Sequence, residues 1–370
     1  MDERFDGEDP DAPGVTPRVS VIIPCHNLGQ YLDEAVESVL AQTFQDFEIL
    51  IVDDGSTDPV TLRVLENFRR PKTHLFRTPN RRLAAARNFL IARARGEYLC
   101  ALDADDKLHP HYLERTTAVL ERESAIAFVG THLQMFGEES SLWPPDDRCD
   151  LATLLCDDTV ITPALVRRSA VLTVGGYDEQ MPHQGDEDWD LWITLVEAGY
   201  QGVVLPEVLF FYRRRPGSMV VACTSGQVHL DLIGYIVGKH RASYRAHLLD
   251  VLLWKERLIS QLRRSNVQLE TELKVDLVPA LERARSELQH LRARLERSRR
   301  EHGGSERPAG QPALLAELEQ HQLALTALRK EYEQRLEEVT ALRSSASWKV
   351  TAPLRAAYEL LFRSFGRSSS

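Results

Sequence analysis

The sequence predicts an α/β protein in which a mostly parallel sheet is flanked by helices and followed by a long α-helical arm. Two observations carry this prediction. Between residues 19 and 102, short apolar segments alternate with segments of helical spacing, as they do where crossover helices join parallel strands. From residue 281 onward, leucines recur in steps of three and four, which is the spacing of a coiled-coil seam.

Four short apolar segments are predicted strands: 19–23, 47–52, 74–77 and 98–102. The segments between them predict helices at 31–42, 59–68 and 83–95. Pro24 is expected to end the first strand, and Asp58 is the expected N-cap of the second helix. Crossovers of this kind make the strands parallel. Their carboxyl ends should therefore meet at one edge of the sheet, where such proteins bind ligands.

The following part of the chain is less regular. Further helices are predicted at 109–122, at 166–172 and directly after 186–190, and further strands at 125–130 and 203–205. Residues 131–160 are expected to form loops over the site.

The composition limits the function. The chain has 370 residues, 43% of them hydrophobic, which is enough for two domains or for one domain with an extended arm. Its net charge of -10 argues against nucleic acid as a partner. Five cysteines without a CxxC pair favour a reducing compartment. The sequence has neither a signal-peptide pattern nor an apolar run of about 18 residues. We therefore expect a cytoplasmic protein, and peripheral contact with the inner face of the membrane stays open.

The strand at 98–102 runs directly into Asp103, Asp105 and Asp106. Three carboxylates within four residues repel one another at low dielectric, so a positive group is expected beside them. Asp103 and Asp105 would point to one side of an extended chain. Two interpretations stay open from these residues alone. One is a Mg²⁺ or Mn²⁺ ion that also binds phosphate oxygens, and the other is a solvated turn that caps the next helix.

Other acidic residues also have two interpretations. Asp53 and Asp54 could accept hydrogen bonds from a nucleobase or a ribose, or they could cap the helix at 59–68. The run Asp186-Glu187-Asp188 precedes a helix, whose positive end favours acids in any case. Its functional interpretation is that one of these carboxylates is a general base on an acceptor hydroxyl.

Basic and aromatic residues are similarly ambiguous. Residues 213–215 are three arginines that could clamp phosphates or form a solvated loop. Trp143 and Trp189 could stack on sugar faces of an acceptor, or they could belong to the core. No GxxxxGK[ST], GxGxxG or GxSxG motif occurs, which argues against a phosphate loop, a dinucleotide site and a hydrolase nucleophile.

Five motifs occur in the order and spacing of one enzyme family. They are VSVIIPCHN, FEILIVDDGSTD, AAARNFLIARARGEYLCALDADD, GGYDE and GDEDWDLWITLVEAGY. On these motifs, residues 18–220 resemble the family 2 inverting glycosyltransferases, whose catalytic domain has the Rossmann-like GT-A fold. The resemblance implies a nucleotide-diphosphate sugar as donor, UDP- or dTDP-linked, and a divalent metal, Mn²⁺ or Mg²⁺, as cofactor.

The resemblance also implies roles for particular residues. The donor nucleotide sugar would be bound by Pro24, His26, Asn27, Asp53, Asp54, Arg82, Arg87, Asp103 and Arg215. The metal would be held by Asp103 and Asp105, and the catalytic base would be Asp188 with Glu187 beside it. Two residues depart from the family pattern. Arg82 stands where the family usually has Gly, and Arg215 stands where it often has a His near the metal and diphosphate.

The arm is expected to associate, because an unpaired leucine stripe would face water. One seam comprises Leu281, Ala284, Leu288, Leu291 and Leu295, and a second comprises Leu318, Leu325, Leu328, Tyr332, Val339 and Leu342. The two seams could pair as a hairpin or with another chain. The segment SASWKVTAPLR resembles one that follows coiled coils in bacterial enzymes of surface-polysaccharide synthesis.

The predicted organisation therefore has six parts. These are a disordered lead at 1–17, a GT-A domain at 18–225, a helical or coiled-coil segment at 226–301, a linker at 302–312, a second coiled-coil helix at 313–343 and an amphipathic tail at 344–370.

The function expected is inverting glycosyl transfer to an acceptor hydroxyl, in the synthesis of a bacterial cell-surface polysaccharide or glycan. The acceptor would be a saccharide or lipid-linked, and the arm would bind a second copy or another protein. An alternative is an inactive GT-A-like scaffold whose coiled coil assembles a polysaccharide complex, although the intact acidic set argues against it. A nucleotidyltransferase would need a Gly-rich basic loop after the first strand, which PCHNLGQ lacks.

Overall fold

The computed structural model describes residues 16–138, 140–143, 148–215, 217–219, 223, 226–301 and 311–344. Most of the predicted lead and linker, and the tail from residue 345 on, lie outside these residues. The chain forms two compact units, Met1–Leu252 and Leu253–Ser370. No helix among those described is both long and apolar enough to cross a membrane.

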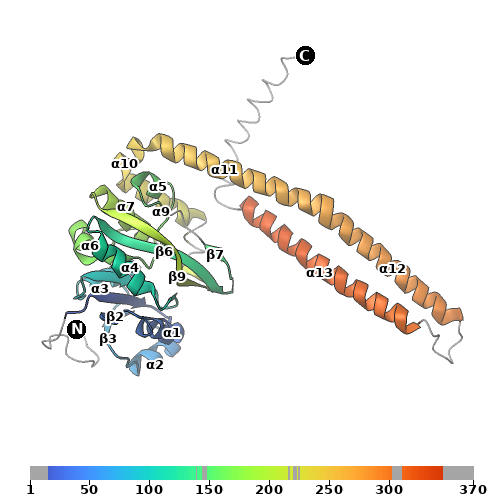
Figure 1. Ribbon diagram of the computed structural model, residues 1–370, viewed down its shortest axis with the longest axis horizontal. Coiled ribbons are helices and arrows are strands. Elements are labelled where there is room, and N and C mark those ends of the chain that lie inside the picture. Colours follow the sequence, from blue (N-terminus) through green and yellow to red (C-terminus); the bar gives the residue numbers. More distant parts are fainter. Residues whose placement is uncertain are drawn as a thin grey trace, which may run out of the picture. The chain divides into compact units, whose positions relative to one another are not determined.

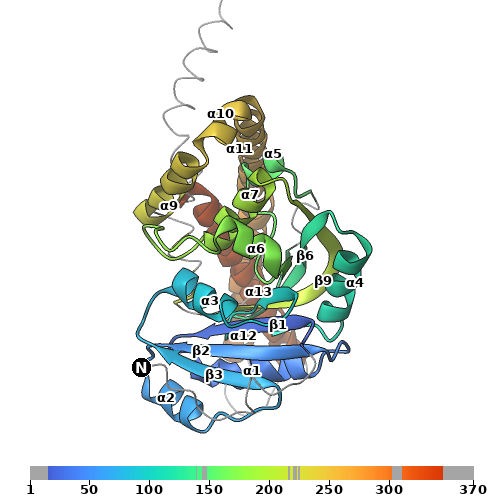
Figure 2. The same cartoon turned by 90° about the vertical axis from the view of Figure 1, so that its left-hand side faces the viewer.

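The first unit is built on one mixed sheet (Figures 1 and 2). Its described strands are β1 (Val19–Cys25), β2 (Phe47–Asp54), β3 (Thr73–Thr78), β4 (Tyr98–Ala101), β5 (Lys107–Leu108), β6 (Ile126–Gly137), β7 (Leu142–Trp143), β8 (Leu165–Arg167) and β9 (Gln201–Arg214). The strand order is β3-β2-β1-β4-β8-β6-β9-β5, with β7 paired to β6. The strands β3, β2, β1 and β4 are mutually parallel, which confirms the predicted α/β class.

The helices cover both faces of this sheet. In the first unit they are α1 (Gly29–Leu40), α2 (Pro59–Glu66), α3 (Leu83–Ile91), α4 (Tyr112–Arg122), α5 (Leu151–Leu154), α6 (Arg168–Val174), α7 (Glu187–Glu197), α9 (Gly226–Lys239) and α10 (Arg241–Ala246). Strand side chains alternate between the faces. In β1, Val21 and Ile23 pack on the face covered by α1 and α4, whereas Ile22 packs on the face covered by α3 and α7.

Several predicted boundaries were wrong. Pro24 does not end β1, which continues to Cys25 with Pro24 opposite Val52. A proline close to a strand end removes a single donor from the ladder, so pairing survives it. Residues 166–172 are not one helix, because Val166 and Arg167 still pair in β8 before α6 begins.

The predicted loops at 131–160 were wrong in their first part. Strand β6 continues to Gly137 because β9 pairs with it in parallel up to its last residue, Gly137 opposite Arg214. The polar residues Thr131 and Gln134 interrupt the apolar pattern by which a strand is predicted from the sequence. Both nevertheless pair with β9. The predicted strand at 203–205 is correspondingly part of the much longer β9.

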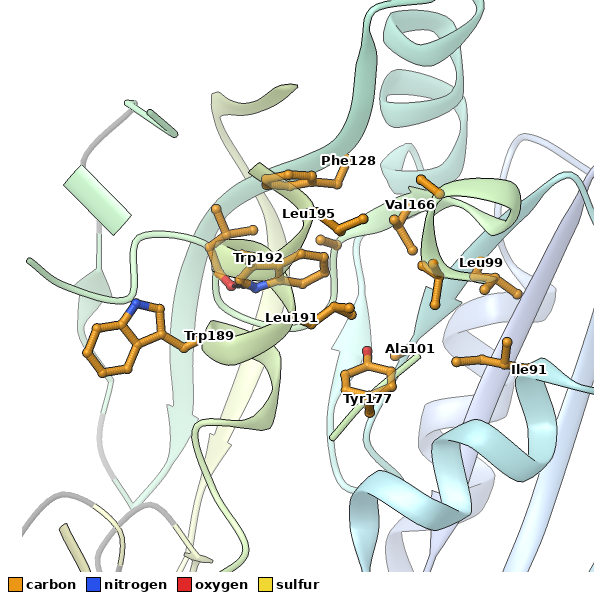
Figure 3. Close-up of a cluster of buried hydrophobic side chains, with 14 of the residues drawn as sticks. Ile91, Leu99, Ala101, Phe128, Val166, Tyr177, Trp189, Leu191, Trp192 and Leu195 are labelled. Carbon is orange, nitrogen blue, oxygen red and sulfur yellow. Dashed lines mark hydrogen bonds between the residues drawn. The ribbon is translucent and has the colours of Figure 1, made fainter. Parts of the chain in front are cut away.

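Two tryptophans fix helix α7, one to the sheet and the other to α5. The ring of Trp192 stacks on Phe128 of β6 with the centroids 4.9 Å apart, and its Nε1 donates to the Val160 carbonyl at 2.6 Å. The Nε1 of Trp189 donates to the Leu154 carbonyl at 2.6 Å. Figure 3 shows Trp192 between Phe128 and Leu191, while Trp189 projects from the other side of the helix. This packing sets the position of the acidic residues at the start of α7.

The second unit is a helical hairpin (Figure 1). Helix α11 (Leu248–Thr271) begins in the first unit and continues through a π-helical turn (Glu272–Leu277) into α12 (Val278–Glu301), and α13 (Gln311–Ser344) packs against α12. All five residues of the predicted first seam are buried. At the other end of the hairpin, Leu273 and Leu277 pack with Val339, Tyr332 and Leu328 of the second seam. Of the two predicted pairings, the hairpin is therefore the one observed.

Candidate active site

A pocket of about 510 Å³ opens at the carboxyl ends of β1, β2 and β4. The start of α7 and the end of β9 form its other walls. Most of the predicted site residues line it, namely Pro24, His26, Asp54, Arg87, Asp103, Asp105, Trp143, Glu187, Asp188, Trp189 and Arg215. The parallel sheet thus brings together residues that are up to 191 positions apart in the sequence, from Pro24 to Arg215.

The end of β1 carries a pair of residues with different roles. His26 lines the pocket, and its Nδ1 lies 2.9 Å from the Asp54 carbonyl oxygen. Asn27 does not line the pocket. Its backbone is left-handed with φ of 56°, and its Oδ1 accepts from the backbone N–H groups of Thr57 and Asp58, both at 2.8 Å. Asn27 therefore holds the turn after β2 against β1.

The end of β2 places two buried carboxylates. Asp54 lines the pocket and accepts from the Arg81 backbone N–H at 2.8 Å and from the Thr78 hydroxyl at 3.2 Å. Asp53 does not line the pocket, and it accepts from the Ser56 backbone N–H at 2.9 Å. Neither Asp53 nor Asp54 caps α2. The N-cap of α2 is Asp58, as expected, and it accepts from the Thr61 backbone N–H at 2.8 Å.

The end of β4 places Asp103 and Asp105 on the pocket wall, each paired with an arginine. Asp103 Oδ1 accepts from Arg87 Nη2 at 2.8 Å, and Asp105 Oδ2 accepts from Arg215 Nε at 2.6 Å. Burial and the neighbouring charge of Asp103 raise the pKa of Asp105, although Arg215 counteracts this. Asp106 is buried and does not line the pocket. It accepts from the Arg213 backbone N–H at 2.7 Å, and burial raises its pKa well above its usual range.

The donor set of Asp103 and Asp105 fits a divalent cation bound together with phosphate oxygens. Each carboxylate has one oxygen engaged by an arginine, and among the residues described no other side chain donates to it. In that part of the chain, no group of three or more His, Cys, Asp or Glu side chains is placed to hold a metal. Mg²⁺ and Mn²⁺ commonly take one or two carboxylates and complete their shell with water and substrate phosphate.

The start of α7 presents three carboxylates with three environments. Glu187 is buried, and it accepts from Arg87 Nη1 at 2.6 Å and from the Gly185 backbone N–H at 3.0 Å. Asp188 faces the pocket, and its Oδ2 accepts from the Thr162 hydroxyl at 2.8 Å. Asp186 has a left-handed backbone, and burial together with Asp188 and Glu187 raises its pKa to about 7.

Arg82 does not line this pocket. It is exposed at the N-terminus of α3, with φ of 72°, a conformation that favours glycine. This backbone agrees with the Gly that the family usually has at that position. The Leu83 backbone N–H donates to Gln184 Oε1 at 3.3 Å, and the guanidinium of Arg82, which has no acceptor atom, makes no cap hydrogen bond.

The two predicted acceptor tryptophans differ. Trp143 lies on β7 at the pocket rim and is 46% exposed, so its ring is accessible. Trp189 is 6% exposed and its indole N–H is bonded to Leu154, which makes it mainly a core residue that also borders the pocket.

Several pocket residues were missed by sequence reasoning. They include Asn80, Asp157, Asp158, Thr162, Tyr212 and His229. Asp158 belongs to the segment 131–160 that was predicted as loops, whereas Thr162 lies just beyond that segment and Tyr212 was given no role. The signal that could have identified Tyr212 is its place directly before the arginines at 213–215.

Comparisons with known proteins show what this chain is similar to. Residues 20–186 match glycosyl transferase family 2. EpsE of Bacillus subtilis (strain 168) is 32% identical over 208 residues, which cover 53% of this chain and 73% of EpsE. Chondroitin synthase of Escherichia coli is 32% identical over 192 residues, which cover 50% of this chain but only 27% of that protein. The chain therefore spans most of EpsE but about a quarter of the synthase.

Solved structures agree in fold. Residues 1–349 of TarS from S. aureus, crystallised with UDP-GlcNAc, superpose with a TM-score of 0.52 at 18% identity, covering 75% of this chain and 81% of that chain. This likeness confirms the predicted GT-A fold. With the family match and the similarity to EpsE, it follows that the chain belongs to glycosyl transferase family 2. It is a nucleotide-sugar-dependent glycosyltransferase, the enzyme class of that family.

Proposed function

We propose that this protein is an inverting glycosyltransferase that moves a sugar from a nucleotide-diphosphate donor to an acceptor hydroxyl. One observation carries the proposal. The carboxylate of Asp188 faces the same pocket as Asp103 and Asp105, and these acids come from different elements, the start of α7 and the end of β4. A site of this form separates the group that takes the proton from the groups that bind the leaving diphosphate.

In the proposed reaction, Asp188 accepts the proton of the acceptor hydroxyl as its oxygen attacks the anomeric carbon. The new carbon–oxygen bond forms as the bond to the diphosphate breaks, and the nucleoside diphosphate leaves with that electron pair. Attack from the face opposite the leaving group inverts the anomeric centre. Asp188 is oriented for this role by Thr162 at 2.8 Å and by its own helix start, since its Oδ1 accepts from the Trp189 backbone N–H at 2.9 Å.

Other residues of the pocket would bind the donor. Pro24, His26 and Asp54 surround the space proposed for the nucleoside, with Asn27 and Asp53 holding the turn beside it. Asp103 and Asp105 would hold Mn²⁺ or Mg²⁺, which when bound would neutralise the charge of the leaving diphosphate. Arg215 lines the pocket beside Asp105 and suits direct contact with phosphate oxygens.

The acceptor and the setting are also part of the proposal. Names of the relatives, such as chondroitin synthase, favour polysaccharide synthesis, with a saccharide or lipid-linked acceptor. Trp143 at the rim could stack on an acceptor sugar. We place the enzyme in the cytoplasm at the inner face of the membrane, with the arm binding a second copy or another protein. The first turns of α11 expose Leu249, Leu252 and Leu253, which suits such an interaction.

A nucleotide-sugar panel tests the proposed donor. Thermal unfolding of the full chain would be measured with UDP-, dTDP- and GDP-linked sugars, each with Mn²⁺ and with EDTA. We expect at least one donor to raise the unfolding temperature in Mn²⁺, because ligands that bind only the native state stabilise it. If no nucleotide sugar shifted the transition under either condition, the proposed donor class would be wrong.

A further inference from the structure

The buried side chain of Arg87 joins two of the elements that form the pocket, the end of β4 and the start of α7. It lies in α3 and is 1% exposed. Its Nη1 donates to Glu187 Oε1 at 2.6 Å, and its Nη2 donates to Asp103 Oδ1 at 2.8 Å. One guanidinium therefore connects the strand end proposed to hold the leaving group with the helix end that carries Asp188.

Arginine suits this bridge better than lysine would. The planar guanidinium presents its two Nη groups at a fixed spacing, so it can engage two carboxylates from different elements at once. Its Nε has no hydrogen-bond partner in the part of the chain that the structure describes. An ammonium on a flexible stem could not reproduce this two-point contact.

Arg87 is held in place by its surroundings. Its Cζ lies 5.1 Å from the centroid of the Tyr177 ring, which lies in the same buried cluster as Ala101 and Leu191 (Figure 3). The adjacent Asn88 fastens the backbone of Tyr177, accepting from its N–H at 2.9 Å and donating to its carbonyl at 2.8 Å. The bridge is therefore part of a packed layer and not a surface ion pair.

The charges of this triad do not balance, because two carboxylates share one guanidinium. The second oxygen of Glu187 is satisfied by the Gly185 N–H at 3.0 Å. The second oxygen of Asp103 has no donor among the described residues, and the Asp103 side chain is 31% exposed. The negative charge that Arg87 does not neutralise therefore lies on Asp103, whose side chain faces the pocket.

We infer that Arg87 is a positioning residue through which Glu187 tunes the affinity of Asp103 for the cation and diphosphate of the donor. While Glu187 is charged, it shares the guanidinium, and Asp103 stays negative enough to attract a divalent cation. Without that charge, Arg87 neutralises Asp103 alone. This inference rests on the proposed function, since it takes Asp103 as part of the donor site.

The test is isothermal titration of the full chain with UDP, GDP and dTDP, in Mn²⁺ and in EDTA. Glu187→Gln keeps the shape of the side chain and a carbonyl oxygen that can accept from Arg87. We expect it to weaken nucleotide binding about tenfold in Mn²⁺ and to change binding in EDTA by less than twofold. With titrations at pH 8, where Asp186 is mostly charged, Asp186→Asn is the matched control, because it removes a charge from the same helix end without touching the bridge. It should bind within twofold of wild type.

A double-mutant comparison separates coupling from a local effect. In an Arg87→Lys background, Glu187→Gln should lose its effect on binding in Mn²⁺, because the residue that transmits it is gone. The inference would be overturned if Glu187→Gln weakened nucleotide binding equally in the wild-type and Arg87→Lys backgrounds. It would also be overturned if Glu187→Gln alone bound nucleotide as tightly as the wild type. Thermal unfolding of each variant is also measured without ligand. If Arg87 and Glu187 had only a structural role, their variants would unfold at a lower temperature and still bind nucleotide like the wild type. If the wild-type chain bound none of the three nucleotides, the proposed function itself would fail.

Discussion

The hydroxyl of Thr162 donates to Asp188 Oδ2 at 2.8 Å, and the backbone N–H of Thr162 lies 3.4 Å from the same oxygen. The segment before β8 therefore orients a carboxylate that begins α7. A base must point its free lone pair at the acceptor, so this contact limits the rotation of the Asp188 side chain.

Thr162→Val removes this hydroxyl and nearly preserves the volume. We expect kcat to fall about tenfold with little change in donor affinity, because a hydrogen bond to a charged group is worth about 1.5–3 kcal/mol. Thr162→Ser is the matched control and should keep most of the activity. Steady-state kinetics with donor titration would decide, and equal kcat for the Val and Ser variants would contradict this role.

Asp105→Ala should weaken divalent-dependent donor binding by at least about tenfold, because it removes one of two proposed metal ligands. Calorimetric titrations of nucleotide in Mn²⁺ and in EDTA measure the effect. Asp157→Ala, which removes another acid from the pocket lining, is the control. Identical affinities of wild type and Asp105→Ala in Mn²⁺ would count against a metal at this position.

Asp186 should make the fold more stable in acid than at neutral pH. Its pKa is raised from 3.8 to about 7 on folding, chiefly by burial and then by Asp188 and Glu187. Between these values the native state binds more protons than the unfolded state, so stability falls as pH rises from about 4 to 7. The stabilising contribution of protonated Asp186 is therefore fully present below its pKa in the unfolded chain, 3.8, and is lost above its pKa in the folded protein, about 7.

Asp186→Asn removes this penalty, and asparagine tolerates the left-handed backbone. We expect the variant to be more stable than wild type by about 2 kcal/mol at pH 8, a figure already reduced for solvent screening, and equally stable at pH 4. Chemical unfolding at both pH values gives the comparison. A variant with the same stability difference at pH 4 and pH 8 would show that Asp186 does not titrate as described.

The hairpin of the second unit should depend on its buried seam. Leu288 is 4% exposed, whereas Leu323 of α13 is 68% exposed. Leu288→Ala should speed hydrogen exchange in α12 and α13, since truncating a buried leucine costs about 2–5 kcal/mol. Leu323→Ala should leave exchange unchanged. Equal exchange rates in the two variants would mean that α12 and α13 do not pack through this seam.

The sequence predicted the parallel strands and the acidic strand ends because both depend on local patterns. Apolar runs followed by Asp53 or Asp103 can be read without knowing what lies beside them. Strand β6 could not be predicted beyond residue 130, because its polar positions become a strand only through pairing with β9.

The sequence was enough to predict which residues belong to the site. It was not enough to predict which of them contact one another. Arg87 was identified through its family motif as a donor ligand, while its contacts to Asp103 and Glu187 depend on three elements meeting in space. Asn27 and Asp53 were expected in the site, and they lie beside it as supports. Thr162 carried no signal in the sequence, because a single threonine before a proline is common in loops.

The most direct test of the proposed mechanism compares donor binding and sugar transfer in Asp188→Asn. With the donor found in the nucleotide-sugar panel, titration calorimetry gives the affinity, and release of nucleoside diphosphate in the presence of acceptor gives the turnover. The proposed role predicts donor affinity within about twofold of wild type and turnover reduced by about 10³-fold or more, as loss of a general base requires. Wild-type turnover by Asp188→Asn would contradict it.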